Sequence, residues 1–104
     1  MRKAKVFVKG IEAGILSEIK PGENYRFEYL DRYNGLEISR TMTIDQREFN
    51  FNEFPPFFDG LLPEGYQLEG LLKIKKIDRK DCFSQLLAVG EDLIGVVTVK
   101  EILE

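Results

Sequence analysis

A chain of 104 residues has room for one domain, so we expect residues 1–104 to fold as a single unit. The 15 basic and 18 acidic residues give a formal net charge of -3, which argues against nucleic acid as a direct partner because such binding needs clustered cations. Histidine is absent and cysteine occurs once, which excludes a histidine base and a cysteine-based zinc site. The glycines also lack the spacing of a phosphate-binding loop or a dinucleotide fingerprint, so we expect neither metal nor cofactor.

The lone cysteine and the apolar runs indicate where the protein works. Cys82 lies in an apolar pattern and has no intramolecular partner, so we expect a small core residue in a reducing cytoplasm. No apolar run approaches the roughly 20 residues of a membrane span. The first residues lead into an alternating pattern rather than the apolar region of a signal peptide. The sequence therefore predicts a cytoplasmic protein with no membrane partner.

Alternating apolar side chains predict a hairpin at the start of the chain. Residues 4–9 place apolar side chains at every second position, which is strand periodicity. Residues 10–12 can turn the chain, and residues 13–19 can return as the second arm.

Two further strands are expected to extend this hairpin into a meander. After a turn at residues 21–24, Tyr25, Phe27 and Tyr29 share one side of a third strand, a spacing that suits a pleated surface. Within residues 36–44 the apolar side chains stand at even-numbered positions, on one side of an extended chain, which predicts a fourth strand.

Helical spacing replaces this alternation in the second half. Leu68, Leu71 and Leu72 fall at i, i+3 and i+4, which predicts a helix over residues 64–75. This helix is expected to present the three leucines on one face.

A second helix and a closing strand are expected to follow. Asp78 can cap the helix with Asp81 three residues on, and Gly90 can end it. The β-branched run within residues 94–99 predicts a strand. The apolar stripe of this second helix is Cys82, Phe83, Leu86 and Leu87.

These elements predict an α+β fold, in which a small antiparallel sheet, made of the N-terminal meander plus the C-terminal strand, packs with two to three short helices. The residues expected to form the core are Val6, Val8, Phe27, Leu71, Phe83, Leu87 and Val97.

The stretch of residues 54–65 has the composition of neither an ordinary helix nor an ordinary strand. Two adjacent prolines restrict the backbone, so a helix can begin only at about Pro56, and Pro63 ends or kinks it. Gly60 and Gly65 can adopt positive φ. This stretch therefore predicts a short, rigid, apolar turn of helix between two breaks.

The same stretch supplies the candidate partner-binding residues. A small sheet with few helices cannot obviously hide all of its apolar side chains, and an exposed apolar patch marks a protein interface. Core and surface positions stay equally open for the phenylalanines, whereas Tyr66 is expected at the surface as an anchor. The candidates are Phe54, Phe57, Phe58, Asp59, Leu61, Leu62, Glu64 and Tyr66.

Asp59 and Glu64 could in principle be the acid/base pair of a small carboxylate-dependent hydrolase. A structural role explains them better, because Asp59 precedes a glycine in a turn and Glu64 lies in the first turn of a helix, where the dipole favours an anion. We therefore expect a binding protein and not an enzyme.

Four segments in this order resemble the N-terminal subdomain of HipA-type serine/threonine kinases, which are toxins of bacterial toxin–antitoxin systems. The segments are VxVxGxxxGxL at 6–16, FFDGLLPEG at 57–65, DCFSQLLAVGED at 81–92 and IGVVTV at 94–99. The sequence stops at Glu104, where such a kinase would continue into its catalytic core. The resemblance therefore implies a stand-alone, HipS-type antitoxin of a three-gene system.

In that system the kinase, HipT, lacks this subdomain, and a separate helix-turn-helix protein, HipB, binds DNA. The resemblance implies that this chain binds and neutralises a HipT-like kinase, and it allows a HipB-like protein in the same complex. It also implies that a bulky aromatic after LLPEG inserts into the kinase; here Tyr66 stands where the family often has tryptophan. Two alternatives stay open: a non-catalytic subunit that completes or activates such a kinase, and a truncated N-terminal piece of a HipA kinase.

Overall fold

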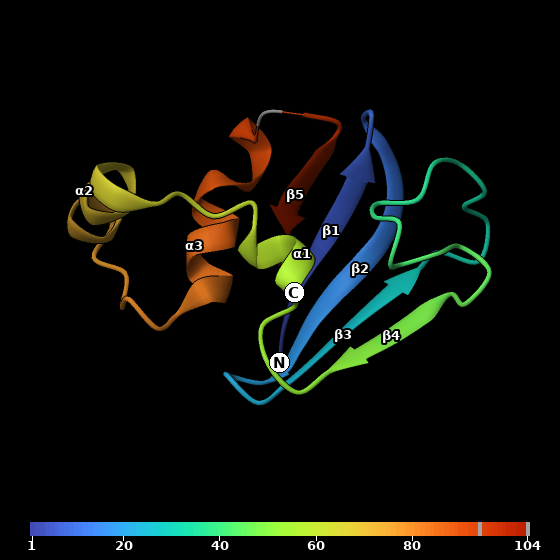
Figure 1. Cartoon of the computed structure of the whole chain (residues 1–104), viewed down its shortest axis with the longest axis horizontal. Coiled ribbons are helices and arrows are strands. Elements are labelled where there is room, and N and C mark those ends of the chain that lie inside the picture. The colour runs from blue at the N-terminus through green and yellow to red at the C-terminus, as the bar shows by residue number, and fades with distance from the viewer. Residues whose placement is uncertain (94, 104) are drawn as a thin grey trace.

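The computed structural model describes residues 1–93 and 95–103, which form an α+β fold around one antiparallel sheet (Figure 1). The sheet has five strands in the order β4-β3-β2-β1-β5, and every neighbouring pair is antiparallel. The strands are β1 (Arg2–Val8), β2 (Ile11–Lys20), β3 (Asn24–Tyr29), β4 (Glu48–Phe51) and β5 (Val97–Glu101). The fold class predicted from the sequence is confirmed.

The opening hairpin is confirmed, with a shorter turn than the sequence predicted. Only Lys9 and Gly10 form the turn, with φ of 51° and 79°, the conformation of a two-residue type I′ turn. Ile11 and Glu12, predicted to lie in the turn, already pair with β1. Ala4, Val6 and Val8 of β1 are all buried, so the apolar side of this strand faces the core.

The fourth strand was predicted in the wrong place. Residues 36–44 form no strand beyond an isolated bridge between Ser39 and Met42, and β4 begins only at Glu48. The intervening residues 30–47 form a compact loop whose ends meet where the Tyr29 N–H donates to the Arg47 carbonyl at 2.9 Å.

Three short α-helices and one 3₁₀ turn complete the described chain. They are α1 (Pro56–Asp59), α2 (Gly65–Lys75), α3 (Cys82–Val89) and η1 (Gly90–Asp92). Figure 1 shows α1 and α3 against one face of the sheet, and α2 at the end of the molecule beyond α3. The predicted helix at residues 64–75 is confirmed as α2.

The cap of α3 is Asp81, not Asp78 as the sequence predicted. The Asp81 carboxylate accepts from the Ser84 N–H at 3.1 Å, whereas Asp78 accepts from the Lys80 N–H in the preceding turn. Gly90 ends α3 without positive φ, since its φ is -57°. It is needed for space, because a Cβ there would collide with the Val99 carbonyl oxygen.

The last strand, β5, begins at Val97, within the stretch predicted at 94–99; Ile94 lies outside the described residues. The core lies between the sheet and the α1 and α3 helices. Of the predicted core residues, Leu71 and Leu87 are only half-buried. Leu71 lies on α2, which contributes no buried residue, whereas Leu87 packs against the core from α3. The predicted residues that are buried are Val6, Val8, Phe27, Phe83 and Val97.

Candidate partner-binding site

The stretch predicted to be a rigid turn is a helix between two breaks. Pro55, with φ -58° and ψ 129°, directs the chain into α1, which begins at Pro56 as predicted. Gly60 has a right-handed φ of -65°, so it does not use the freedom expected of it. Gly65 does, with φ 58°, and starts α2. Proline restriction and one left-handed glycine therefore define the ends of the turn.

Phe58 belongs to the core and not to the surface. Its side chain is fully buried, and its ring lies 6.0 Å from the Phe27 ring and 5.1 Å from the Phe57 ring. Phe54 and Phe57 are half-buried, with the Phe54 ring packed edge-on against Tyr25 at 5.4 Å. Phe58 is therefore a core residue and is no longer a candidate contact residue.

The remaining candidates split by polarity. Leu61 and Leu62 are half-buried and pack against the core, so each offers only part of its side chain to a partner. Asp59 and Glu64 are exposed. These residues follow one another along the chain between α1 and α2, and each exposes part or all of its side chain.

Tyr66 is the most exposed large hydrophobic side chain among the described residues, at 97%. It lies in the first turn of α2, directly after the left-handed Gly65. Tyrosine offers a large and stiff contact area with one polar end, which suits an interface anchor. The sequence expectation of an exposed Tyr66 agrees with the structure.

Ile74 extends this apolar surface and was missed from the sequence. It is 78% exposed and lies eight residues after Tyr66 on α2. The sequence reasoning assigned only the leucines of α2 to a helical face. The spacing of Tyr66 and Ile74, about two turns apart, was the signal that could have revealed Ile74 as a second exposed apolar residue.

The family is decided by comparison with known proteins. Residues 4–100 match the family model described as the HipA N-terminal domain. The chain belongs to this family. An uncharacterized protein of Haemophilus influenzae is 34% identical over 101 residues, covering 97% of this chain and 93% of that protein. A solved structure, the N-terminal domain of HipA toxin, is similar with a TM-score of 0.78 and 32% identity, covering 100% of this chain and 95% of that one.

In this member of the HipA N-terminal domain family, an ion-pair network connects α3 to the sheet. The Arg2 guanidinium donates to Glu18 at 2.7 Å, to Asp81 at 2.8 Å and to Ser84 at 2.6 Å. Glu18 is 3% exposed and also accepts from the Tyr25 hydroxyl at 3.3 Å. The network therefore holds the start of α3 against β1 and β2.

The Cys82 thiol is not activated in this HipA N-terminal domain. Cys82 is half-buried. Burial raises its pKa, and the carboxylates of Asp59 and Asp81 raise it further, so the nucleophilic thiolate is disfavoured. A structural role remains the better explanation.

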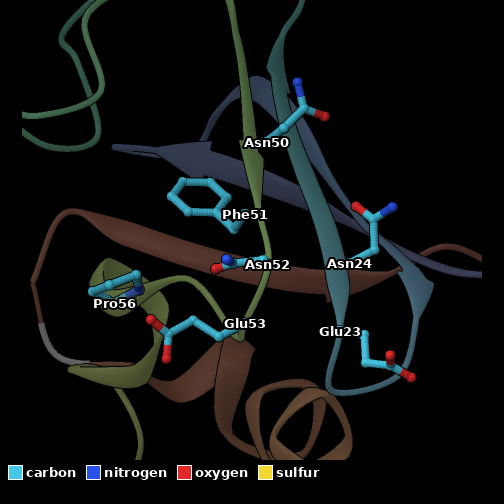
Figure 2. A pocket seen from close by; sticks show the side chains of 7 residues that line it. All are labelled: Glu23, Asn24, Asn50, Phe51, Asn52, Glu53 and Pro56. Carbon is cyan, nitrogen blue, oxygen red and sulfur yellow. The ribbon is translucent and has the colours of Figure 1, made fainter.

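An open hollow of about 600 Å³ lies near the ends of β3 and β4 (Figure 2). Figure 2 shows Glu23 and Asn24 toward the right, Asn50 above them, and Phe51, Asn52, Glu53 and Pro56 toward the left. The residues that line it are Glu23, Asn24, Asn50, Phe51, Asn52, Glu53 and Pro56. Neither Tyr66 nor another residue of α2 lines this hollow.

The described residues contain no group of three or more histidine, cysteine, aspartate or glutamate side chains arranged to hold a metal ion. In the same part of the chain, no helix has the length and apolar character needed to cross a membrane.

Proposed function

We propose that this chain is an antitoxin of the bacterial cytoplasm that binds and inhibits a HipA-like (HipT-like) serine/threonine kinase. The contact surface is Tyr66 together with the exposed parts of Phe54, Phe57, Leu61 and Leu62, and the Asp59 and Glu64 carboxylates border it. The observation that carries the proposal is the nearly complete exposure of a large aromatic side chain beside a rigid apolar turn.

Family membership supports the kinase context. The similar solved structure is named as a domain of the HipA toxin, and the HipA N-terminal domain is a non-catalytic part of such proteins. The alignment with the Haemophilus influenzae relative covers 93% of that protein, so that relative is of nearly the same size. A HipB-like DNA-binding protein is the expected third member of the complex.

The inhibition that we propose needs no chemistry from this chain. A kinase must close two lobes around ATP and bring its metal-binding and catalytic groups together. A rigid apolar wedge at the lobe junction would hold the lobes apart. The buried Phe58 and the prolines reduce the conformational entropy that the turn loses on binding, which favours affinity.

A second candidate function is a subunit that completes or activates the kinase. It is supported by the name of the solved structure, which makes this domain part of a toxin and not its inhibitor. Both functions use the same docking surface, so they differ only in the effect on kinase activity. A truncated N-terminal piece of a HipA kinase would behave as this second candidate.

The test is co-expression with a HipA-type kinase that lacks this subdomain, comparing the unaltered chain with Tyr66→Ala. We expect the unaltered chain to restore growth and to co-purify with the kinase. Tyr66→Ala should weaken binding by about 2 kcal/mol, the usual scale of an anchor residue and roughly 30-fold in Kd. The measurement is a Kd by calorimetry, with far-UV circular dichroism showing that the fold is intact.

Ile11→Ala is the matched control, because Ile11 is also an exposed apolar residue, at 63%, but lies at the hairpin far from α2 (Figure 1). It should bind like the unaltered chain. Binding that leaves or increases toxicity would establish the activating subunit instead. Equal affinity of Tyr66→Ala and the unaltered chain would remove Tyr66 from the site.

A further inference from the structure

The outer face of α2 carries two large apolar side chains that nothing in the described chain covers, with the exposed polar Gln67 and Lys73 at its edges. No side chain of α2 is buried, while Tyr66 is 97% and Ile74 is 78% exposed. Gly70 lies midway between them, and a Cβ on Gly70 would have nothing within 4 Å. We call these three residues, Tyr66, Gly70 and Ile74, the α2 outer face.

The α2 outer face is symmetric about Gly70. Tyr66 and Ile74 each lie four residues from Gly70, which is about 6 Å along the helix axis and close to one full turn. If a second α2 lies antiparallel across the first with Gly70 at the two-fold axis, each Tyr66 meets the other copy's Ile74. Such self-complementarity is the requirement for an isologous dimer interface.

The charges of α2 are self-complementary in the same sense. The exposed carboxylates Glu64 and Glu69 precede Gly70, and the exposed ammonium groups of Lys73, Lys75 and Lys76 follow it. An antiparallel second copy therefore sets the acidic end of each helix over the basic end of the other. Glu69 already pairs with Arg79 within the chain. Glu64 and Lys76 each lie six residues from Gly70, so the two-fold axis would set Glu64 of one copy at the same level along the helix as Lys76 of the other.

The backbone at Gly70 leaves room for a close approach. An open hollow of about 610 Å³ adjoins Gly70 and is lined by Glu69, Leu72, Lys73 and Arg79 as well. Glycine in the middle of a helix costs roughly 0.5–1 kcal/mol relative to alanine. A helix crossing at Gly70 gives a physical reason for this cost, because two helices come closest where one lacks a side chain.

We propose that the free chain pairs with a second copy of itself through the α2 outer face, as an antiparallel two-fold dimer centred on Gly70. Two helices of eleven residues bury less surface than a standard protein interface, so the dimer is weak and depends on concentration. Tyr66 belongs to both contact surfaces, so self-pairing and kinase binding exclude each other. This mutual exclusion rests on the proposed function, whereas the self-pairing does not.

The test places a cysteine on the proposed two-fold axis. In a Cys82→Ala background, Gly70→Cys should form an intermolecular disulfide under mild oxidation, since two thiols at the axis can reach the required Cα separation of about 6 Å. Lys75→Cys is the matched control, exposed on the same helix. Its two thiols would lie roughly 15 Å apart along the axis in the dimer, so it should cross-link far more slowly.

Charge exchange and sedimentation test the same arrangement without cysteine. The unaltered chain should show concentration-dependent dimerisation by sedimentation equilibrium, and Ile74→Lys should abolish it. Glu64→Lys and Lys76→Glu should each weaken dimerisation several-fold, and the double variant should restore it. A chain that is monomeric at millimolar concentration, equal cross-linking of both cysteine variants, or a double variant no better than the singles would each overturn the proposal.

A kinase competition experiment separates this inference from the proposed function. Adding a HipA-type kinase that lacks this subdomain should suppress the Gly70→Cys cross-link. If the kinase binds and dimerisation is absent, self-pairing alone is wrong. If dimerisation is present and the kinase does not bind, only the proposed function is wrong. Kinase binding that leaves the cross-link unchanged would refute the shared use of Tyr66.

Discussion

At the scale of single residues, one arginine connects both ends of the fold. Arg2 lies 79 positions from Asp81 in the sequence, yet its guanidinium donates to that carboxylate at 2.8 Å and stacks over the Phe83 ring at 5.0 Å. The local pattern favoured Asp78 as the helix cap, because spacing alone cannot show which aspartate a distant arginine contacts. The Arg2 contact and the Ser84 N–H together make Asp81 the cap.

Asp81 should make the stability of the fold depend on pH. Burial alone would raise its pKa, but hydrogen bonds from Arg2 and Ser84 outweigh burial, and the net pKa is below the ordinary value of 3.8. A lowered folded-state pKa contributes stability above the unfolded-state pKa and loses it as the pH falls through the folded-state value. The free energy of unfolding should therefore decline as the pH drops below 3.8.

Asp81→Asn should remove this part of the acid dependence and cost about 1 kcal/mol at neutral pH, because Arg2 and Asp81 are each about one-third exposed. Asparagine still caps a helix, so α3 should persist. Urea denaturation followed by circular dichroism over a pH series measures both effects. Asp45→Asn, an exposed loop carboxylate, is the control; an acid profile unchanged by Asp81→Asn would contradict the argument.

At the scale of elements, the loop of residues 30–47 shows why apolar side chains at every second position need not form a strand. Ile38 and Met42 are buried, as the predicted strand required, but they are held by a side chain and not by a neighbouring strand. The Tyr29 hydroxyl accepts from the Ile38 N–H at 3.0 Å and donates to the Met42 carbonyl at 2.5 Å. Burial raises the pKa of Tyr29, so the hydroxyl stays protonated and keeps donating.

Tyr29→Phe should therefore release this loop while keeping the aromatic core. It leaves the Ile38 N–H and the Met42 carbonyl without their buried partner, which costs about 2 kcal/mol. Amide exchange at Ile38 should speed up, and urea denaturation should show the lost stability. Tyr33→Phe is the matched control, since the Tyr33 hydroxyl serves only the Leu36 carbonyl and the change should cost less. Equal exchange rates at Ile38 in Tyr29→Phe and the unaltered chain would refute this role.

At the scale of the whole molecule, local patterns predicted the order and type of elements but not what each one covers. The N-terminal hairpin, β3, α2 and the family were all predicted, because periodicity and motif order are properties of neighbouring residues. Burial of Phe58 against Phe27 could not be predicted, because it depends on how the α1 turn folds back over a distant strand. The partial exposure of Leu71 could not be predicted either, because its helix lies beyond α3 and away from the core.

The last prediction rests on the different positions of Phe58, in the core, and Tyr66, at the surface. Phe58 is fully buried where α1 meets the sheet, so Phe58→Ala should lower the free energy of unfolding by about 3–5 kcal/mol, the usual cost of a phenylalanine-sized cavity. Tyr66→Ala, at a position 97% exposed, should change stability by less than about 0.5 kcal/mol. Urea denaturation measures both. Kinase affinity, corrected for the folded fraction, should then fall for Tyr66→Ala and change little for Phe58→Ala. If Phe58→Ala stays stable but loses kinase affinity, Phe58 leaves the core to reach the partner, and the turn binds by rearranging and not as a rigid wedge.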